Sequence, residues 1–293
     1  MCRFYWCFSL ALIVFINSFA HAEVGEGLLW RVHKPKHPAN YLFGTIHVDD
    51  KRVKKLNPEI RRRFEESRTV CLEVLPDRET QVGIGLAMLL SGGQTLDELV
   101  GEPLFNRLSL ALNKKGMTPV ESVYLKPWAA MIVLSRPESA GGLALDEQLY
   151  HWAQHEYKQL CALETLQEQL SIFDELALPD QIILLKDTLD NLEQLQAHNE
   201  QLILAYLSGD LDDLYRISMA LEGEDDELSA HLREKLIDQR NVRMAQRMEP
   251  FLKKGKAFIA VGALHLPGKN GLLQLLREKG FVVTSPKVPV SPW

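Results

Sequence analysis

The sequence predicts an α/β protein, in which a central mixed or parallel sheet is flanked by helices and a helical subdomain is inserted before the last strands. Two observations support this fold class. Short apolar runs of strand length alternate with amphipathic helical patterns along the chain. Residues 179–254 then show helical periodicity without a convincing strand, after which strand-like sequence returns. The composition, 46% hydrophobic and 25% charged over 293 residues, provides ample material for a core.

The predicted strands are runs rich in β-branched and apolar residues, bounded by proline, glycine or polar residues. They cover residues 28–32, 41–46, 69–75, 159–163, 257–261 and 281–284. The predicted helices cover residues 58–67, 145–156 and 271–279, one that begins after Thr95, and at least three within 179–254. Pro58 suits the first position of its helix, Thr95 opens a capping-box pattern, and Gly280 is well placed to end the last helix.

The first 22 residues have the form of a signal peptide. Arg3 precedes an almost wholly apolar run over residues 4–19, and Ala20-His21-Ala22 matches an A-x-A cleavage site. We therefore expect an exported protein, periplasmic or secreted, whose mature part, residues 23–293, forms a single domain without a stable membrane span. The alternative is that the apolar segment stays uncleaved as an anchor.

Two cysteines, Cys71 and Cys161, remain after removal of the first 22 residues. In an exported protein they form either one disulfide or two buried free thiols, since both lie in strand-like apolar runs. The formal net charge of −6 is spread along the chain without a basic block. This distribution argues against nucleic acid as a partner.

The most informative pattern is a pair of Gly-x-x-His segments, Gly44 to His47 and Gly262 to His265, each at the end of an apolar strand-like run. In an open α/β sheet, ligands bind beyond the carboxyl ends of the strands. Both imidazoles are therefore expected at one edge of the sheet. Two neutral imidazoles, a carboxylate and an open position are typical of a catalytic divalent-metal site. The alternative is two unrelated histidines, one of them a hydrogen-bonded core residue.

Two glutamates at strand ends, Glu73 and Glu164, are the candidate carboxylates. A carboxylate in an apolar strand needs a cation or hydrogen-bond donors, because burying it unpaired costs several kcal/mol. For Glu73 the partner is either a metal, which makes it a ligand or general base, or an arginine. The alternative for Glu164 is an interaction with the first turn of a helix.

Arg240 and Asn241 are candidate supporting residues. Asn241 interrupts the apolar stripe formed by Ile237, Met244 and Met248, and Arg240 borders it. Polar groups on an inward face need buried partners. Such partners are Glu73, Glu164 or an oxyanion; the alternative is a purely structural salt bridge.

Other catalytic patterns are weak or absent from the sequence. His151 and His155 lie four residues apart, but the H-E-x-x-H order is missing, which favours a solvated helix face. The absence of a G-x-S-x-G elbow, a Walker A loop and a Rossmann glycine pattern argues against serine hydrolases, P-loop enzymes and dinucleotide binders.

Taken together, the motifs resemble those of the TraB/PrgY/GumN family, whose animal relatives include the Tiki proteins. The matching segments are Gly44-Thr45-Ile46-His47, Leu72-Glu73, Leu145-Asp146-Glu147-Gln148-Leu149, Leu163-Glu164-Thr165 with Gln167, Arg240-Asn241, and residues 261–268 with their Leu-Pro-Gly ending. The resemblance implies a fold similar to the erythromycin esterase and ChaN-like proteins. It also implies a metal-dependent peptidase that uses manganese or cobalt, with zinc as a further candidate. By the same resemblance, His47, Glu73 and His265 become metal or base positions, and Glu164, Arg240 and Asn241 become supporting positions.

The sequence thus leads to one hypothesis and one alternative. We expect an exported metallohydrolase acting on a peptide or protein, in which a divalent ion held by His47, His265 and one glutamate polarises the scissile carbonyl and lowers the pKa of a bound water. The other glutamate takes the proton of the water, while Arg240 and Asn241 steady the carboxylates or the oxyanion. The alternative is a non-catalytic protein that binds a peptide, or haem and iron, with the same histidines.

Overall fold

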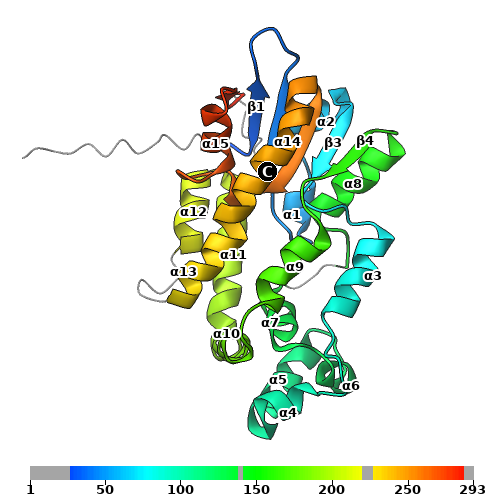
Figure 1. Ribbon diagram of the computed structural model, residues 1–293, viewed down its shortest axis with the longest axis vertical. Helices are drawn as coiled ribbons and strands as arrows, with labels where there is room; N and C mark the ends of the chain where they lie inside the picture. Colours follow the sequence, from blue (N-terminus) through cyan, green and yellow to red (C-terminus); the bar gives the residue numbers. More distant parts are fainter. Residues whose placement is uncertain (1–26, 138–140, 220–226, 287–293) are drawn as a thin grey trace, which may run out of the picture.

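The computed structural model describes residues 27–137, 141–219 and 227–286 of the chain (Figure 1). Its centre is one six-stranded sheet with the strand order β4-β3-β5-β2-β1-β6. Helices surround this sheet, so the predicted α/β class with a mixed sheet is confirmed. The predicted signal peptide, residues 1–22, lies outside the described residues.

The strands agree closely with the sequence prediction. They are β1 Leu29–His33, β2 Asn40–Thr45, β3 Thr69–Leu72, β4 Gln159–Ala162, β5 Ala257–Gly262 and β6 Val282–Thr284. The prediction was too long for β3, which ends at Leu72 and not at residue 75. Beyond Leu72 the chain bends at Glu73 and Val74, and the carbonyl of Glu73 accepts the N–H groups of Leu163 and Glu164, which follow β4.

Four neighbouring strands, β4, β3, β5 and β2, run parallel to one another. In the central pair, Gly44 of β2 is opposite Val261 of β5, and Thr45 is opposite Gly262. β1 is antiparallel to both β2 and β6, which makes the sheet mixed. The carboxyl ends of the four parallel strands therefore lie along one edge.

Fifteen α-helices follow or connect the strands within the described residues. They are α1 Lys51–Lys54, α2 Pro58–Glu66, α3 Arg78–Ala87, α4 Leu96–Val100, α5 Glu102–Lys114, α6 Pro119–Val123, α7 Pro127–Ser135, α8 Leu145–His155, α9 Leu166–Asp174, α10 Leu178–Asp190, α11 Leu192–Ser208, α12 Leu211–Met219, α13 Glu227–Arg233, α14 Gln239–Lys254 and α15 Leu272–Glu278. A π-helical segment, η1 Glu234–Asp238, precedes α14, and a 3₁₀ turn, η2 Ala263–His265, follows β5.

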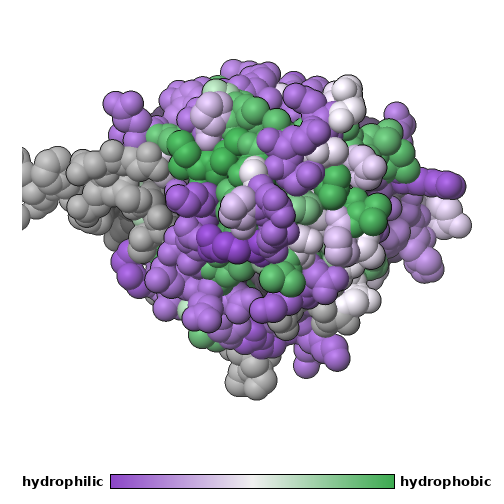
Figure 2. All heavy atoms as spheres, turned by 90° about the horizontal axis from the view of Figure 1, so that it is seen from below, coloured by the Kyte–Doolittle hydropathy of each residue, from purple (hydrophilic) through white to green (hydrophobic). Residues whose placement is uncertain are grey.

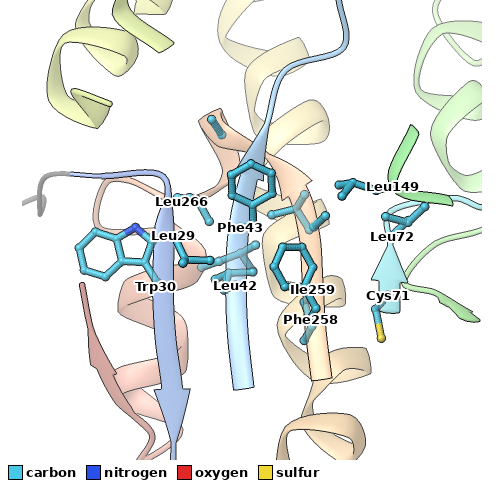
Figure 3. Close-up of a cluster of buried hydrophobic side chains, with 14 of the residues drawn as sticks. Leu29, Trp30, Leu42, Phe43, Cys71, Leu72, Leu149, Phe258, Ile259 and Leu266 are labelled. Atoms are coloured by element: carbon cyan, nitrogen blue, oxygen red, sulfur yellow. The ribbon is translucent and has the colours of Figure 1, made fainter. Parts of the chain in front are cut away.

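The apolar side chains form two separate cores. The larger core surrounds the sheet, and Figure 3 shows part of it, with Phe43, Phe258 and Ile259 from β2 and β5 at its centre. The second core is formed by residues of α4, α5, α7 and α10 around the fully buried Trp128. Helices in the predicted helical region 179–254 contribute to both: α10 packs on α7, whereas α11, α12 and α14 supply residues to the larger core.

The end of the molecule formed by α4 to α6 exposes hydrophobic residues in separate patches among hydrophilic ones (Figure 2). Exposed side chains of these helices include Leu110 of α5 and Val120 of α6. Within the described residues, no helix is both long enough and apolar enough to cross a membrane.

A disulfide joins Cys71 of β3 to Cys161 of β4. The two residues are directly opposite each other in the parallel ladder. Of the two alternatives for these cysteines, the structure therefore contains the bonded pair. The bond links the two strands that lead into Glu73 and Glu164.

Gly44 allows β2 to approach the segment after β5. A Cβ atom added at this position would lie 2.9 Å from a Leu266 methyl carbon and 3.1 Å from the Cα of Ala263. The first glycine of the Gly44 to His47 segment therefore has a packing role.

We predict that Gly44→Ala destabilises the protein by about 1–3 kcal/mol, because the added methyl group overpacks a contact with backbone. The matched control is Gly85→Ala in α3, where a Cβ would meet no atom within 4 Å. That exposed helical change should raise stability by about 1 kcal/mol through helix propensity. Urea unfolding monitored by circular dichroism measures both, and equal stability of Gly44→Ala and the wild type would contradict the packing role.

Candidate metal and catalytic site

Four of the predicted site residues follow the carboxyl ends of four adjacent parallel strands. His47 comes shortly after β2, Glu73 directly after β3, Glu164 after β4, and His265 at the end of the turn after β5. This edge of the sheet is where open α/β proteins bind their ligands. The structure thus places residues from both ends of the chain at one edge.

Three of these side chains converge on the face of Gly262. A Cβ atom added to this glycine would lie 3.3 Å from Glu73 Oε1, 3.5 Å from His265 Cδ2 and 3.6 Å from His47 Nε2. The space in front of Gly262 is therefore lined by one carboxylate and two imidazoles. Any larger residue at this position would fill it.

His265 is held rigidly in the interior. Its side chain is only 5% exposed, and its Nδ1 lies 2.8 Å from Asn241 Oδ1. The Asn241 amide donates from Nδ2 to the carbonyl of Asn270 at 2.9 Å, which fixes the amide orientation. Nδ1 of His265 is therefore the donor, and Nε2 keeps its lone pair, 3.6 Å from Glu73 Oε1. Burial lowers the pKa of His265 to about 4, so the ring is neutral at pH 7.

His47 is the exposed member of the site. Its side chain is 58% exposed, and its Nδ1 lies 2.7 Å from Asp146 Oδ2. The other oxygen of Asp146 accepts the hydroxyl of Thr45 at 2.7 Å. The negative charge of Asp146 raises the pKa of His47 from 6.5 to about 9. The sequence interpretation assigned no role to Asp146, although it lies in the segment from Leu145 to Leu149 that carried the family resemblance.

Glu73 lies between the histidines and a buried arginine. Its Oε1 accepts the N–H of Gly262 at 2.6 Å, and its Oε2 accepts Arg240 Nη2. Burial raises the pKa of Glu73, but the positive charges of His265, Arg240 and His47 outweigh it and lower the pKa to about 2. His265 contributes as the imidazolium that it becomes at the acidic pH where Glu73 titrates. Glu73 is thus an ionised carboxylate at neutral pH.

Glu164 has both oxygens engaged by guanidinium groups, and its side chain is fully buried at 0% exposure. Arg240 Nε donates to its Oε2 at 2.8 Å, and Arg243 Nη2 donates to its Oε1 at 2.8 Å. Gln169 Nε2 lies 3.2 Å from one oxygen of each glutamate and so bridges Glu73 and Glu164. Each carboxylate oxygen therefore has a donor, as burial of a charge requires.

Two members of this network, Arg243 and Gln169, were missed in the sequence. Arg243 is one turn beyond Arg240 on α14, so the spacing of the two arginines could have indicated a shared face. Gln167 was quoted with the family motif, but it is exposed, and Gln169 reaches the carboxylates. The start of α9 at Leu166 sets which glutamine faces inward.

Arg240 and Asn241 are both buried, at the start of α14 and directly after the π-helical segment η1. Such segments occur frequently at functional sites. Arg240 joins the two carboxylates, and Asn241 orients His265. Both predicted supporting residues therefore contact the other predicted site residues.

The donor set suits a divalent metal in chemical terms, since two imidazoles and a carboxylate occur with an open position in catalytic metal sites. Across residues 27–137, 141–219 and 227–286, however, no three histidine, cysteine, aspartate or glutamate side chains form a ready-made cluster for one ion. His151 and His155, in contrast, are exposed on α8, in agreement with the predicted solvated face.

The family model for the TraB/PrgY/gumN family matches residues 28–285. The chain belongs to the TraB/PrgY/gumN family. All six predicted site residues lie inside the matched region, together with Asp146, Gln169 and Arg243. The family assignment made from the sequence motifs is confirmed.

Within this family, the chain is similar to curated relatives in animals and bacteria. It is 30% identical to "Metalloprotease TIKI2" of Danio rerio over 90% of this chain and 62% of that protein. It is 29% identical to "Metalloprotease TIKI1" of Homo sapiens over 88% of this chain and 61% of that protein. The chain thus spans about three-fifths of the length of these metalloproteases. "Uncharacterized protein YbaP" of Shigella flexneri is 24% identical, over 83% of this chain and 89% of that protein. No solved structure matches the chain significantly.

We predict that Arg240→Met costs about 3–5 kcal/mol of stability at neutral pH, because it leaves two buried carboxylates without their shared cation. The pH dependence has a definite sign. The folded-state pKa of Glu73 is about 2, below its ordinary value of 4.5, so ionised Glu73 stabilises the wild type above pH 4.5 and this contribution is lost as the pH falls toward 2. The variant loses the part of this contribution that Arg240 supplies, so the stability difference is largest near pH 7 and shrinks in acid.

The matched control for this prediction is Arg243→Met. Arg243 is 29% exposed and contacts only one of the two site glutamates, Glu164, so the expected loss is about 1 kcal/mol. Urea unfolding of the metal-free proteins between pH 3 and pH 7 compares the variants. A loss for Arg240→Met that is independent of pH, or equal to that for Arg243→Met, would contradict the buried-charge interpretation.

Proposed function

We propose that this protein is an exported metallopeptidase that cleaves a peptide or protein substrate with a divalent cation held by His47, His265 and Glu73. One observation carries the proposal: the two imidazoles and the carboxylate converge in front of Gly262. The hydrogen bonds at Nδ1 of both rings further support it, because metal-binding histidines usually donate their other ring N–H to a carboxylate or carbonyl group.

The relatives support the reaction class. Proteins of Danio rerio and Homo sapiens that cover most of this chain are named metalloproteases. The name fits the chemistry of the site, since a bound divalent cation supplies Lewis acidity toward a carbonyl group and makes a coordinated water more acidic. Manganese or cobalt is the proposed ion on the basis of the family resemblance, and zinc is a further candidate because imidazole nitrogen and carboxylate oxygen also suit it.

His47 completes the ligand set from the solvent-exposed side. The ring of His265 is fixed by Asn241, and Glu73 is fixed by Gly262 and Arg240. His47 is exposed, and its Nε2 faces the same space as the other two donors. A cation at Nε2 would displace the proton that Asp146 favours on the ring, so binding of the cation would be coupled to loss of a proton.

The two glutamates have different proposed roles. Glu73 presents Oε1 to the space shared with the histidines and can serve as ligand or proton acceptor there. Glu164 is enclosed by Arg240, Arg243 and Gln169. Its proposed role is to position Arg240, whose guanidinium then holds Glu73 in its ionised form.

Two observations support export. Residues 1–22 have the pattern of a signal peptide. The disulfide between Cys71 and Cys161 is the kind of bond that forms and persists in an oxidising compartment such as the periplasm or the extracellular space.

We expect His47→Ala and His265→Ala each to weaken Mn²⁺ binding by more than about 100-fold. Loss of a metal ligand should cost more affinity than loss of a residue that hydrogen-bonds a ligand, which typically costs about 10–100-fold. Both should also abolish cleavage in a peptide library supplied with manganese, cobalt or zinc. The controls are His151→Ala and His155→Ala, which remove exposed histidines of α8. Isothermal titration calorimetry measures binding, and mass spectrometry detects the products.

Full metal content and activity in both site variants would refute the proposed site. Metal binding that depends on both histidines without any product would instead favour the alternative function, a non-catalytic protein that binds a peptide or iron. Wild-type cleavage that persists in the presence of chelator would contradict the metal-dependent reaction.

A separate experiment tests export. After expression of all 293 residues in a Gram-negative bacterium, amino-terminal sequencing should find Glu23 as the first residue of the periplasmic protein. Ala22→Tyr, which places a large residue at the cleavage site, should leave the segment attached. Recovery of the wild type from the membrane fraction with its first 22 residues intact would favour the anchor.

A further inference from the structure

The loop that carries His47 is attached to the start of α8 by alternate residues. Thr45 Oγ1 donates to Asp146 Oδ1 and His47 Nδ1 contacts Asp146 Oδ2, both at 2.7 Å. Two residues further along, Asp49 accepts the N–H of Gly142. Thr45, His47 and Asp49 thus contact residues 142 and 146, so the loop is held against the start of α8 and the residues before it.

We propose that Asp146 is the positioning residue of the site, with one carboxylate oxygen bound to Thr45 and the other fixing the ring of His47. This inference rests on the proposed function, because it assigns the reason why the exposed histidine is ready to bind a cation. It also makes the role of Asp146 distinct from that of a metal ligand.

His47 needs such a residue more than His265 does. The side chain of His47 is 58% exposed, against 5% for His265, so surrounding atoms restrict its ring far less. Among the contacts of the described residues, the hydrogen bond to Asp146 is the only one made by the His47 ring. Fixing Nδ1 as the donor turns Nε2 toward Gly262 and Glu73, so Nε2 is the nitrogen that a cation can bind once its proton leaves. A group fixed before binding loses less rotational freedom when the cation arrives.

Asp146 is well suited to hold the ring. It lies in the first turn of α8, where a negative charge is favoured by the helix N-terminus. The same helix buries Leu145, Leu149 and Ala153 in the larger core, so the carboxylate is attached to a rigid element. The hydroxyl of Thr45 at the end of β2 fixes the second oxygen and so determines which oxygen faces His47.

The two histidines are therefore oriented by different chemistry. His265 donates to the neutral amide of Asn241, whereas His47 donates to a carboxylate. Removal of the charge of Asp146 should consequently affect His47 and leave the geometry of His265 unchanged. This difference allows the role of Asp146 to be tested apart from general stability.

The test is Mn²⁺ binding to the full mature protein, measured by calorimetry at fixed pH. Asp146→Asn keeps the shape of the side chain but removes its charge. We expect a loss of Mn²⁺ affinity of about 10- to 100-fold, the usual effect of losing a residue that hydrogen-bonds a metal ligand. Thr45→Val removes only the hydroxyl and should weaken binding in the same direction by a smaller factor. The control is Asp180→Asn, which removes a first-turn carboxylate from another helix, α10, and should leave the affinity unchanged.

A second readout does not depend on metal. In ¹⁵N NMR spectra of the metal-free wild type recorded above the His47 pKa of about 9, where the ring is neutral, its remaining proton should be on Nδ1. Asp146→Asn should change the signals of His47 while those of His265 stay the same. Unchanged Mn²⁺ affinity and unchanged His47 signals in Asp146→Asn would overturn the positioning role while leaving the proposed function intact. If the wild type binds no Mn²⁺, the proposed function fails, and the NMR comparison alone decides whether Asp146 orients His47.

Discussion

The parallel pairing of β2 with β5 is the constraint on which the rest of the site depends. The two strands come from opposite ends of the chain, and their register places Thr45 opposite Gly262. The two Gly-x-x-His segments therefore leave the sheet side by side. Each glycine then serves a different purpose: Gly44 permits close packing against Ala263 and Leu266, and Gly262 leaves the space that His47, His265 and Glu73 line.

A second constraint is the burial of opposite charges behind this space. Arg240 joins Glu73 and Glu164, and every oxygen of the two carboxylates has a donor from a guanidinium, an amide or a backbone N–H. A buried group of this kind adds little net stability compared with apolar packing, but removal of one partner is costly. The network instead fixes a single arrangement of Glu73: its carboxylate stays ionised, and its Oε1 faces the histidines.

The site is asymmetric in its access to solvent. His265, Glu164 and Asn241 are buried, whereas His47 is exposed on a loop held against α8. The site is therefore open to solvent on the side of His47. The strands that precede Glu73 and Glu164, β3 and β4, are joined by the disulfide between Cys71 and Cys161, which links these two neighbouring strands covalently.

Much of this arrangement could be predicted from the sequence. The strands β2 and β5, the helix α8 and the residues His47, Glu73, Glu164, Arg240, Asn241 and His265 were all found from local patterns of apolar, glycine and charged residues. Two details were not predicted. The predicted strand 69–75 was too long, because the chain bends at Glu73 and Val74, where Glu73 bonds to Leu163 and Glu164 of a distant segment. Gln169, which contacts both carboxylates, was missed, because the inward face of α9 depends on its packing.

The sequence by itself determined which residue types stand at the ends of the strands, because strand ends, glycines and helix starts depend on neighbours along the chain. Only the tertiary structure decided the partners of each carboxylate: Glu73 faces the histidines, and Glu164 lies between Arg240 and Arg243. It also decided that Asp146 holds His47 and that Cys71 pairs with Cys161. The physical reason is that these contacts join residues far apart in the chain, whose distances follow from the order and register of the strands.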